Sequence, residues 1–219
     1  MSGGNSLDAL IGRLAEDGKP VKRLRPPAVR AVLWLIAALV VIAGIVAYHG
    51  LRPDLMETLK EPGEMVSLCA AAATGVAATF AAFFLAVPGY SSRWSLLPLP
   101  VAIVWVSGLG IGCYADWLRF GPEGISLGDS YDCFQAIVFT SLALGVPLAI
   151  LLRHASMVRP VLTAAMGGLA LSSLAAASLE LYHHVDARIM DVVWHVAAVS
   201  LVVALSSGWG AASANRLKG

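Results

Sequence analysis

The run from Ala31 to Tyr48 contains no charged residue, and five further apolar segments follow it along the chain. A run of this length is near the minimum of about 17–20 residues with which a helix crosses a bilayer. The composition agrees: 13% of the residues are charged and 58% are hydrophobic, whereas soluble domains carry roughly 25% charged residues. We therefore predict an all-α, polytopic membrane protein whose domain 30–219 is a six-transmembrane-helix bundle. The predicted spans cover about residues 31–48, 65–88, 96–115, 133–152, 161–179 and 192–214.

The distribution of charge predicts the orientation of these spans. A basic flank, formed by Lys19, Lys22, Arg23, Arg25 and Arg30, precedes the first span. Lys and Arg beside a span are translocated poorly, so this flank favours a cytoplasmic N-terminus. With that assignment, eleven of the 15 Lys and Arg residues fall on the cytoplasmic side and eleven of the 14 Asp and Glu residues on the outer side. We expect both termini to be cytoplasmic, with membrane lipids around the spans.

The cytoplasmic segment 1–29 is predicted to contain one short amphipathic helix, at about residues 6–17. Leu7, Leu10, Ile11 and Leu14 follow the i, i+3, i+4, i+7 spacing of one helical face. Residues 18–29 form a basic, proline-containing linker that includes Pro26-Pro27. A helix this short is marginal alone in water, so its apolar stripe needs a partner. Membrane-surface helices usually have a basic polar face, whereas the polar face of this helix is mildly acidic. A protein partner is therefore favoured, but packing on the bundle or on lipid stays open.

Small residues predict where spans approach one another closely. Gly108 and Gly112 form a GxxxG pattern, Gly167-Gly168 form a pair, and the second span is rich in alanine. Small side chains let membrane helices pack at short distance. We interpret all three groups as packing surfaces.

Two cysteines near the predicted outer face are candidates for sensing. Cys113 lies near the end of the third span and Cys133 begins the fourth, so a short loop would place them on adjacent antiparallel helices. Thiols on an oxidising side can form a disulfide, and thiolate with imidazole suits soft metals. Redox or metal sensing, a structural disulfide and plain packing all remain open for this pair, whereas packing is the leading interpretation for Cys69.

Histidine and acidic residues gather on the same side. Glu180, His183, His184, Asp191 and His195 lie around the end of the fifth span and the start of the sixth. Asp191 and His195 are one helical turn apart and so share a face. Local hydrogen bonding and the sensing of a ligand or proton are both compatible with this group.

The sequence offers little support for catalysis. It contains no HExxH motif and no phosphate-binding loop, so we expect a protein that is not an enzyme and has no resident cofactor. Transient heavy-metal binding at the outer Cys and His residues is compatible with the pattern. The middle of each span is almost wholly apolar, which argues against ion-coupled transport. A small-solute or metal transporter and a membrane redox protein that uses the outer cysteines are the alternatives.

Residue groups spread over nearly the whole chain carry a family resemblance. In order they are Leu10-Ile11-Gly12-Arg13-Leu14-Ala15, Pro20-Val21-Lys22-Arg23-Leu24-Arg25-Pro26-Pro27, Arg30, Trp34-Leu35, Gly50-Leu51-Arg52-Pro53-Asp54-Leu55, Val87-Pro88-Gly89, Gly110-Ile111-Gly112-Cys113, Asp116-Trp117, Cys133-Phe134, Arg159-Pro160, Gly167-Gly168-Leu169-Ala170, His184 and Trp194-His195. This order resembles the NrsF-type anti-sigma factors.

The resemblance implies a function that the residues alone leave open. Members of that family are six-span bacterial inner-membrane proteins that inhibit an extracytoplasmic-function sigma factor. By resemblance, Leu7, Leu10, Ile11 and Leu14 would be buried on the sigma factor, with Arg23 and Arg25 as a polar rim or as topology anchors. Metal or oxidative stress outside would act on Cys113, Cys133, His184, Asp191 and His195 and release the sigma factor. No direct contact with nucleic acid is expected.

Overall fold

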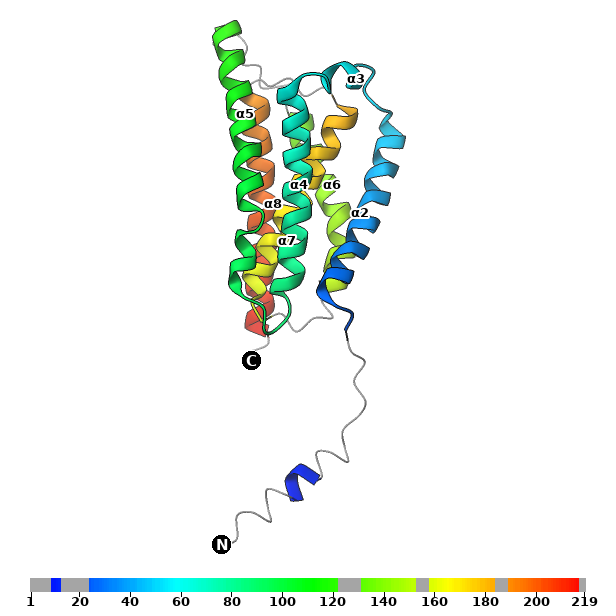
Figure 1. Ribbon diagram of the computed structural model, residues 1–219, viewed down its shortest axis with the longest axis vertical. Helices are drawn as coiled ribbons and strands as arrows, with labels where there is room; N and C mark the ends of the chain where they lie inside the picture. The colour runs from blue at the N-terminus through cyan, green and yellow to red at the C-terminus, as the bar shows by residue number, and fades with distance from the viewer. Residues whose placement is uncertain (1–8, 13–23, 122–130, 153–157, 184–188, 217–219) are drawn as a thin grey trace.

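The computed structural model describes residues 9–12, 24–121, 131–152, 158–183 and 189–216, and these are mostly helical, with no strand among them. Six long helices run side by side (Figure 1). They are α2 (Pro27–His49), α4 (Pro62–Leu85), α5 (Leu99–Phe120), α6 (Tyr131–Leu152), α7 (Pro160–Tyr182) and α8 (Ile189–Arg216). Six helical segments are long and apolar enough to cross a membrane, which confirms the predicted all-α six-helix architecture.

Proline and glycine set several helix ends. Pro27, Pro62 and Pro160 each occupy the first position of a long helix, where the missing N–H costs no hydrogen bond. Gly50 and Gly121 follow α2 and α5 with φ values of 82° and 61°, a left-handed region in which glycine has no steric penalty. A four-residue helix, α3 (Leu55–Thr58), and a 3₁₀ helix, η1 (Ser92–Leu96), lie between long helices.

The third predicted span differs most from the structure. Residues 96–115 were expected to form it, but α5 begins at Leu99 and continues to Phe120. Ser92–Leu96 forms η1 instead, with the Ser91 hydroxyl accepting a hydrogen bond from the Arg93 N–H. The helix therefore extends past the end of the apolar run and includes Asp116 and Trp117.

Helix α7 is the centre of the bundle. It packs against α4, α6 and α8, and most of its residues from Gly167 to Leu179 are buried. Glycines permit the close approach: a Cβ on Gly168 would lie 2.9 Å from the Cα of Val203 in α8, and one on Gly75 in α4 would lie 2.5 Å from the Cγ of Leu174. The packing role predicted for Gly167-Gly168 and for the alanines of α4 is thus confirmed.

Helix α5 lies on the outside of this arrangement, against α4 and α8 (Figure 1). A Cβ on Gly108 would meet no atom within 4 Å, so the predicted contact through Gly108 is wrong for the bundle. Trp105, which is buried, supplies an inner contact of α5 instead.

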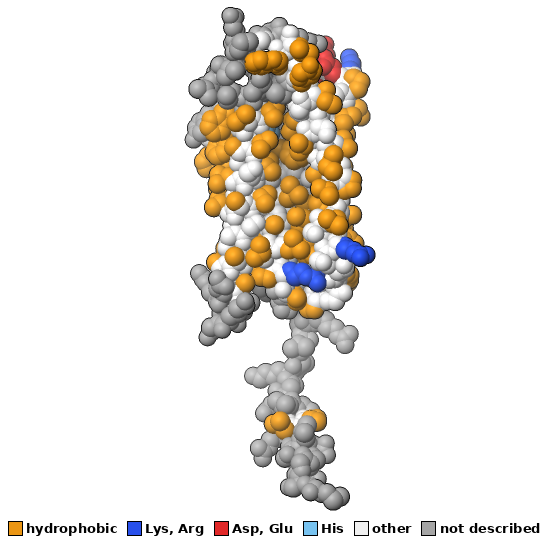
Figure 2. All heavy atoms as spheres, turned by 90° about the vertical axis from the view of Figure 1, so that its left-hand side faces the viewer, with side chains coloured by type: hydrophobic (Ala, Val, Ile, Leu, Met, Phe, Trp, Pro, Cys, Tyr) orange, Lys and Arg blue, Asp and Glu red, His pale blue; other side chains and the backbone are white. Residues whose placement is uncertain are grey.

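We call the end of the bundle at which α2 begins and α8 finishes the proximal end (Figure 1). The opposite end, at which α2 and α7 finish, is the distal end. Figure 2 shows a surface rich in hydrophobic side chains between the two ends, with the acidic side chains of that face at the distal end. This arrangement suits helices surrounded by lipid over their middle and by water at their ends.

We predict that Gly168→Leu destabilises the bundle by about 1–3 kcal/mol, because a larger side chain forces α7 and α8 apart. Unfolding of the purified protein in detergent, followed by circular dichroism, measures the effect. The matched control is Gly108→Leu, which meets open space and should unfold like the wild type. Equal destabilisation by both variants would contradict the packing assignment.

Candidate functional site

The N-terminal turn, residues 9–12, lies apart from the helix bundle on the proximal side (Figure 1). The side chains of Leu10 and Ile11 are 55% and 56% exposed. The alternative in which these two residues pack on the bundle is therefore not what the structure shows. Leu7, Leu14 and Arg23 lie outside the described residues, and Arg25 is exposed.

Arg30 joins the start of α2 to the other helices at the proximal end. It is only 5% exposed, its Nη2 donates a hydrogen bond to the Leu151 carbonyl near the end of α6, and its guanidinium carbon lies 5.3 Å from the centre of the Phe83 ring in α4. A cation is favoured beside the carbonyls that end a helix.

This role of Arg30 was not predicted, because in the sequence the residue is one of several cations that flank the first span. A signal was present. Arg30, Trp34 and Ala38 are spaced by four residues and are all buried on one face of α2. Reading the apolar face of α2 back to its first turn would have included Arg30 in the core.

Polar contacts tie three helix ends together at the distal end. The Ser67 hydroxyl of α4 donates to the Glu180 carboxylate of α7 at 3.3 Å. The Arg52 backbone N–H donates to the Leu181 carbonyl at 3.1 Å, while the Arg52 guanidinium binds both oxygens of Asp54 at 2.9 and 2.6 Å.

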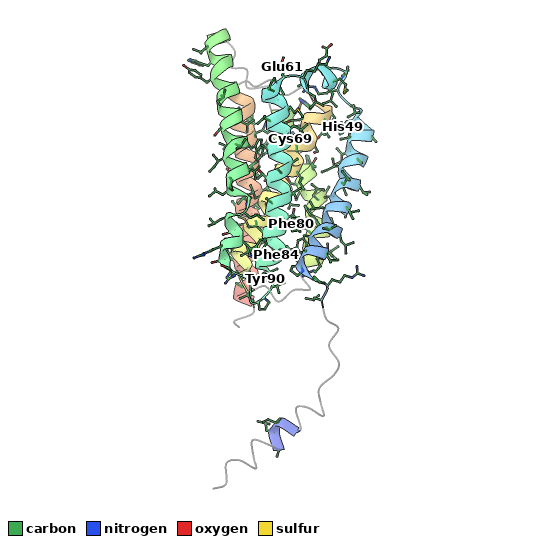
Figure 3. The ribbon with its side chains drawn as sticks, viewed as in Figure 1. His49, Glu61, Cys69, Phe80, Phe84 and Tyr90 are labelled. Carbon is green, nitrogen blue, oxygen red and sulfur yellow. The ribbon has the colours of Figure 1, made fainter. Side chains whose placement is uncertain are left out.

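Aromatic contacts reinforce the distal end. The imidazole of His49, labelled in Figure 3, stacks on the Tyr182 ring with centroids 4.8 Å apart. This contact joins the last residues of α2 and α7. The distal ends of α2, α4 and α7 are thus held as one unit.

Two predicted sensing residues are buried near this unit. Cys133, in the first turn of α6, is 2% exposed and packs in a cluster with Ile137, Leu179 and Ala198. His195 of α8 is 4% exposed. The Phe134 and Trp194 rings beside them meet edge to face with centroids 5.4 Å apart. A reagent from the distal side reaches Cys133 only when this packing opens.

The other predicted sensing positions are only partly described. Cys113 lies within α5, but its side chain and that of Asp191 lie outside the described part of the structure, as does His184. Helix α5 packs mainly on α4 and α8, and α6 mainly on α7, α8 and α2, while Trp105 of α5 and Cys133 of α6 belong to one buried cluster. The expectation that Cys113 and Cys133 lie close together stays a prediction. A disulfide between the two stays an untested prediction.

Cys69 also differs from its leading interpretation. It is exposed on α4 and so does not pack inside the bundle; Figure 3 labels its position on that helix. Among the described residues, no group of three or more His, Cys, Asp or Glu side chains is arranged to hold a metal ion.

An apolar cavity of about 370 Å³ lies among α6, α7 and α8. Ser141 and Ser206 supply hydroxyl groups, and no charged side chain is among the lining residues. This lining provides neither a nucleophile–base pair nor an ion-coordinating set. The cavity therefore does not favour the transport or catalytic alternatives.

A protein-family model described as "Negative regulator of sigma F" (NrsF) matches residues 14–216, which is nearly the whole chain. No curated protein and no solved structure matches the chain.

We predict that the Cys133 thiol reacts slowly in the folded protein because its reaction requires local opening of a buried cluster. In the Cys69→Ser/Cys113→Ser variant, maleimide labelling of Cys133 should be at least about tenfold slower in a mild detergent, which keeps the protein folded, than in denaturing sodium dodecyl sulfate. Equal rates in the two conditions would show that Cys133 is accessible in the folded state.

Proposed function

The chain belongs to the family of negative regulators of sigma F, and on that basis we propose that it is a membrane-bound anti-sigma factor of the bacterial inner membrane. It holds an extracytoplasmic-function sigma factor through its N-terminal segment and releases it on metal or oxidative stress. It acts by binding a protein, with no catalytic step.

The observation that carries the proposal is the exposed apolar pair Leu10 and Ile11 on the N-terminal turn, apart from the bundle. Burying each aliphatic side chain on a partner is worth about 1.5–3 kcal/mol, and ordering the segment offsets part of that gain. The net affinity is modest, which suits a switch, because a coupling of about 1–3 kcal/mol changes such an affinity 5- to 150-fold.

Charge at the proximal end supports a cytoplasmic location for this segment. Arg25, Arg93 and Arg159 lie at the proximal ends of helices, and cations beside spans favour the cytoplasmic side. A sigma factor is a cytosolic partner, so the exposed pair is on the side where it can be bound.

The distal end would then face the periplasm and receive the stress signal. Cys133 and His195 are the described members of the predicted sensing group, with Cys113, His184 and Asp191 as its further members. Because Cys133 is buried, a metal or oxidant would act by trapping an opened form of the distal cluster rather than by filling a preformed site.

We predict that Leu10→Asp/Ile11→Asp releases the sigma factor, because two carboxylates replace the apolar contact surface. Co-purification from native membranes should show at least about a hundredfold weaker retention of the sigma factor, with constitutive transcription from its promoters.

The matched control is Ala9→Asp, which places the same charge on the opposite face of the turn. This control should retain the sigma factor like the wild type. Retention by the double variant, or loss in both proteins, would remove the apolar pair from the binding surface.

We predict that Cys113→Ser/Cys133→Ser abolishes induction by thiol-reactive metals and preserves repression, because soft metals bind thiolates far better than hydroxyls. Sigma-dependent transcription with and without cadmium chloride measures both properties. Cys69→Ser, at an exposed position outside the proposed group, should respond like the wild type. A full response in the double variant would exclude both cysteines from sensing.

A further inference from the structure

The apolar cavity among α6, α7 and α8 is a groove that opens to the side of the bundle. Its floor is formed by buried residues of α7, among them Gly168 and Leu171. Its walls are α6 and α8, whose lining residues Leu142 and Leu205 are 61% and 63% exposed. The inner side of the groove is therefore closed by α7, and its outer side is open between α6 and α8.

Glycines leave the space of the groove unfilled. Gly145 of α6 and Gly167 of α7 line it without a side chain. A Cβ on Gly145 would lie 3.4 Å from the Cδ1 of Leu171, and one on Gly167 would lie 3.3 Å from the Cδ2 of Leu148. A Cβ at Gly145 would thus make an ordinary contact, and a longer side chain there would take up part of the groove.

The groove follows the proximal part of the spans. On α6 its lining runs from Val138 to Leu152, which is about 21 Å at about 1.5 Å per residue. Nearer the distal end the two walls meet instead, through the rings of Phe134 and Trp194 with centroids 5.4 Å apart. The hydrocarbon of one leaflet is about 15 Å deep, which is half of a core about 30 Å thick. The groove is therefore long enough to follow a lipid chain through the whole depth of the proximal leaflet.

The lining favours an apolar occupant over water or an ion. None of the lining residues is charged, and their hydroxyl groups are those of Ser141 and Ser206, on different helices. A buried water needs about two to four hydrogen-bond partners, which this lining does not supply. The Ser141 Oγ has no partner among the described residues, but a serine in a helix can donate to the carbonyl four residues earlier, here that of Ile137. Ser141 therefore does not require a polar ligand.

The groove is too narrow for a helix. A volume of about 370 Å³ spread over about 21 Å of α6 gives a mean cross-section of about 18 Å². An α-helix with its side chains is about 10–12 Å in diameter and needs several times that cross-section. A span of a second copy of this chain, or of another protein, therefore does not fit into the groove. A single unbranched hydrocarbon chain has the shape that does.

We propose that the groove binds one acyl chain of a phospholipid from the proximal leaflet. In the bilayer its open side faces lipid chains, and an empty groove would forfeit dispersion contacts that a chain restores. A chain in the groove touches α6, α7 and α8, whereas a chain elsewhere on the bundle touches one side only. Trp209 lines the groove on α8, and tryptophan is enriched at the level of the headgroups. This binding site depends neither on the sigma factor nor on the cysteines.

Photocrosslinking in a bilayer tests the proposal. The full-length protein is reconstituted into vesicles of phosphatidylglycerol and phosphatidylethanolamine in which part of the phosphatidylethanolamine carries a diazirine in its acyl chain, and the labelled peptides are mapped. Label on the groove walls, residues 138–152 and 201–209, should exceed label on residues 32–40 of α2 by at least about tenfold. The α2 stretch has exposed apolar side chains, such as Leu39 and Val40, outside the groove. Equal labelling of these stretches would overturn the proposal, because it would report only the lipid that surrounds the bundle.

A groove-filling variant tests where the chain lies. Gly145→Leu places a side chain in the groove and should lower the label on the groove walls by at least about tenfold. The matched control is Gly44→Leu, which adds the same side chain to α2, where a Cβ meets no atom within 4 Å, and it should be labelled like the wild type. Ala149→Leu, at an exposed position of the α6 wall, repeats the test if circular dichroism shows that Gly145→Leu is misfolded. Unchanged label in a folded groove-filling variant would overturn the proposal.

Native mass spectrometry of the protein in a mild detergent gives a second readout. The wild type and Gly44→Leu should retain a phospholipid through washing, and Gly145→Leu should retain at least about tenfold less. Retention of detergent alone by the wild type would overturn the assignment to a phospholipid. Equal retention of phospholipid by the wild type and Gly145→Leu would place the bound lipid outside the groove and would overturn the proposal as well.

Discussion

The close approach of α7 to its neighbours is the contact on which the bundle depends. In lipid, apolar helices gain little from the hydrophobic effect on association, so close van der Waals packing between helices must hold them together. Gly168 and Gly75 supply that contact, since a Cβ at either position would lie within 3.0 Å of α8 or of Leu174 in α7. With α7 fixed in this way, α4, α6 and α8 have defined positions, and the residues at their ends have defined neighbours.

The two ends of the bundle differ in what they hold. The distal end is closed by Ser67–Glu180, Arg52–Leu181 and the His49–Tyr182 stack, with Cys133 packed beneath. The exposed apolar turn lies beyond the proximal end, and at that end Arg30 is buried with no hydrogen-bond partner for its Nη1 among the described residues. In the proposed function this division is useful, because sensing would require a closed state that can open and binding would require a surface that is already accessible.

The number and approximate limits of the spans could be predicted because lipid imposes a strict condition: the backbone must be satisfied within each helix over an apolar length. Helix neighbours could not be predicted in the same way. Lipid and protein interior are both apolar, so hydropathy does not say that a side chain at Gly108 would meet no neighbouring helix, or that Cys69 is exposed. Arg30 was missed for a related reason, since a charge at the start of a span is usually assigned to water.

The central position of α7 has a consequence for biogenesis. Chains emerge from the ribosome N-terminal end first, and α7 is the fifth of the six long helices to be made. Helix α4, whose alanine-rich face packs mainly on α7, enters the membrane long before that partner exists. The early helices must therefore persist in lipid as an unassembled set, and they become targets for membrane chaperones and proteases until α7 arrives.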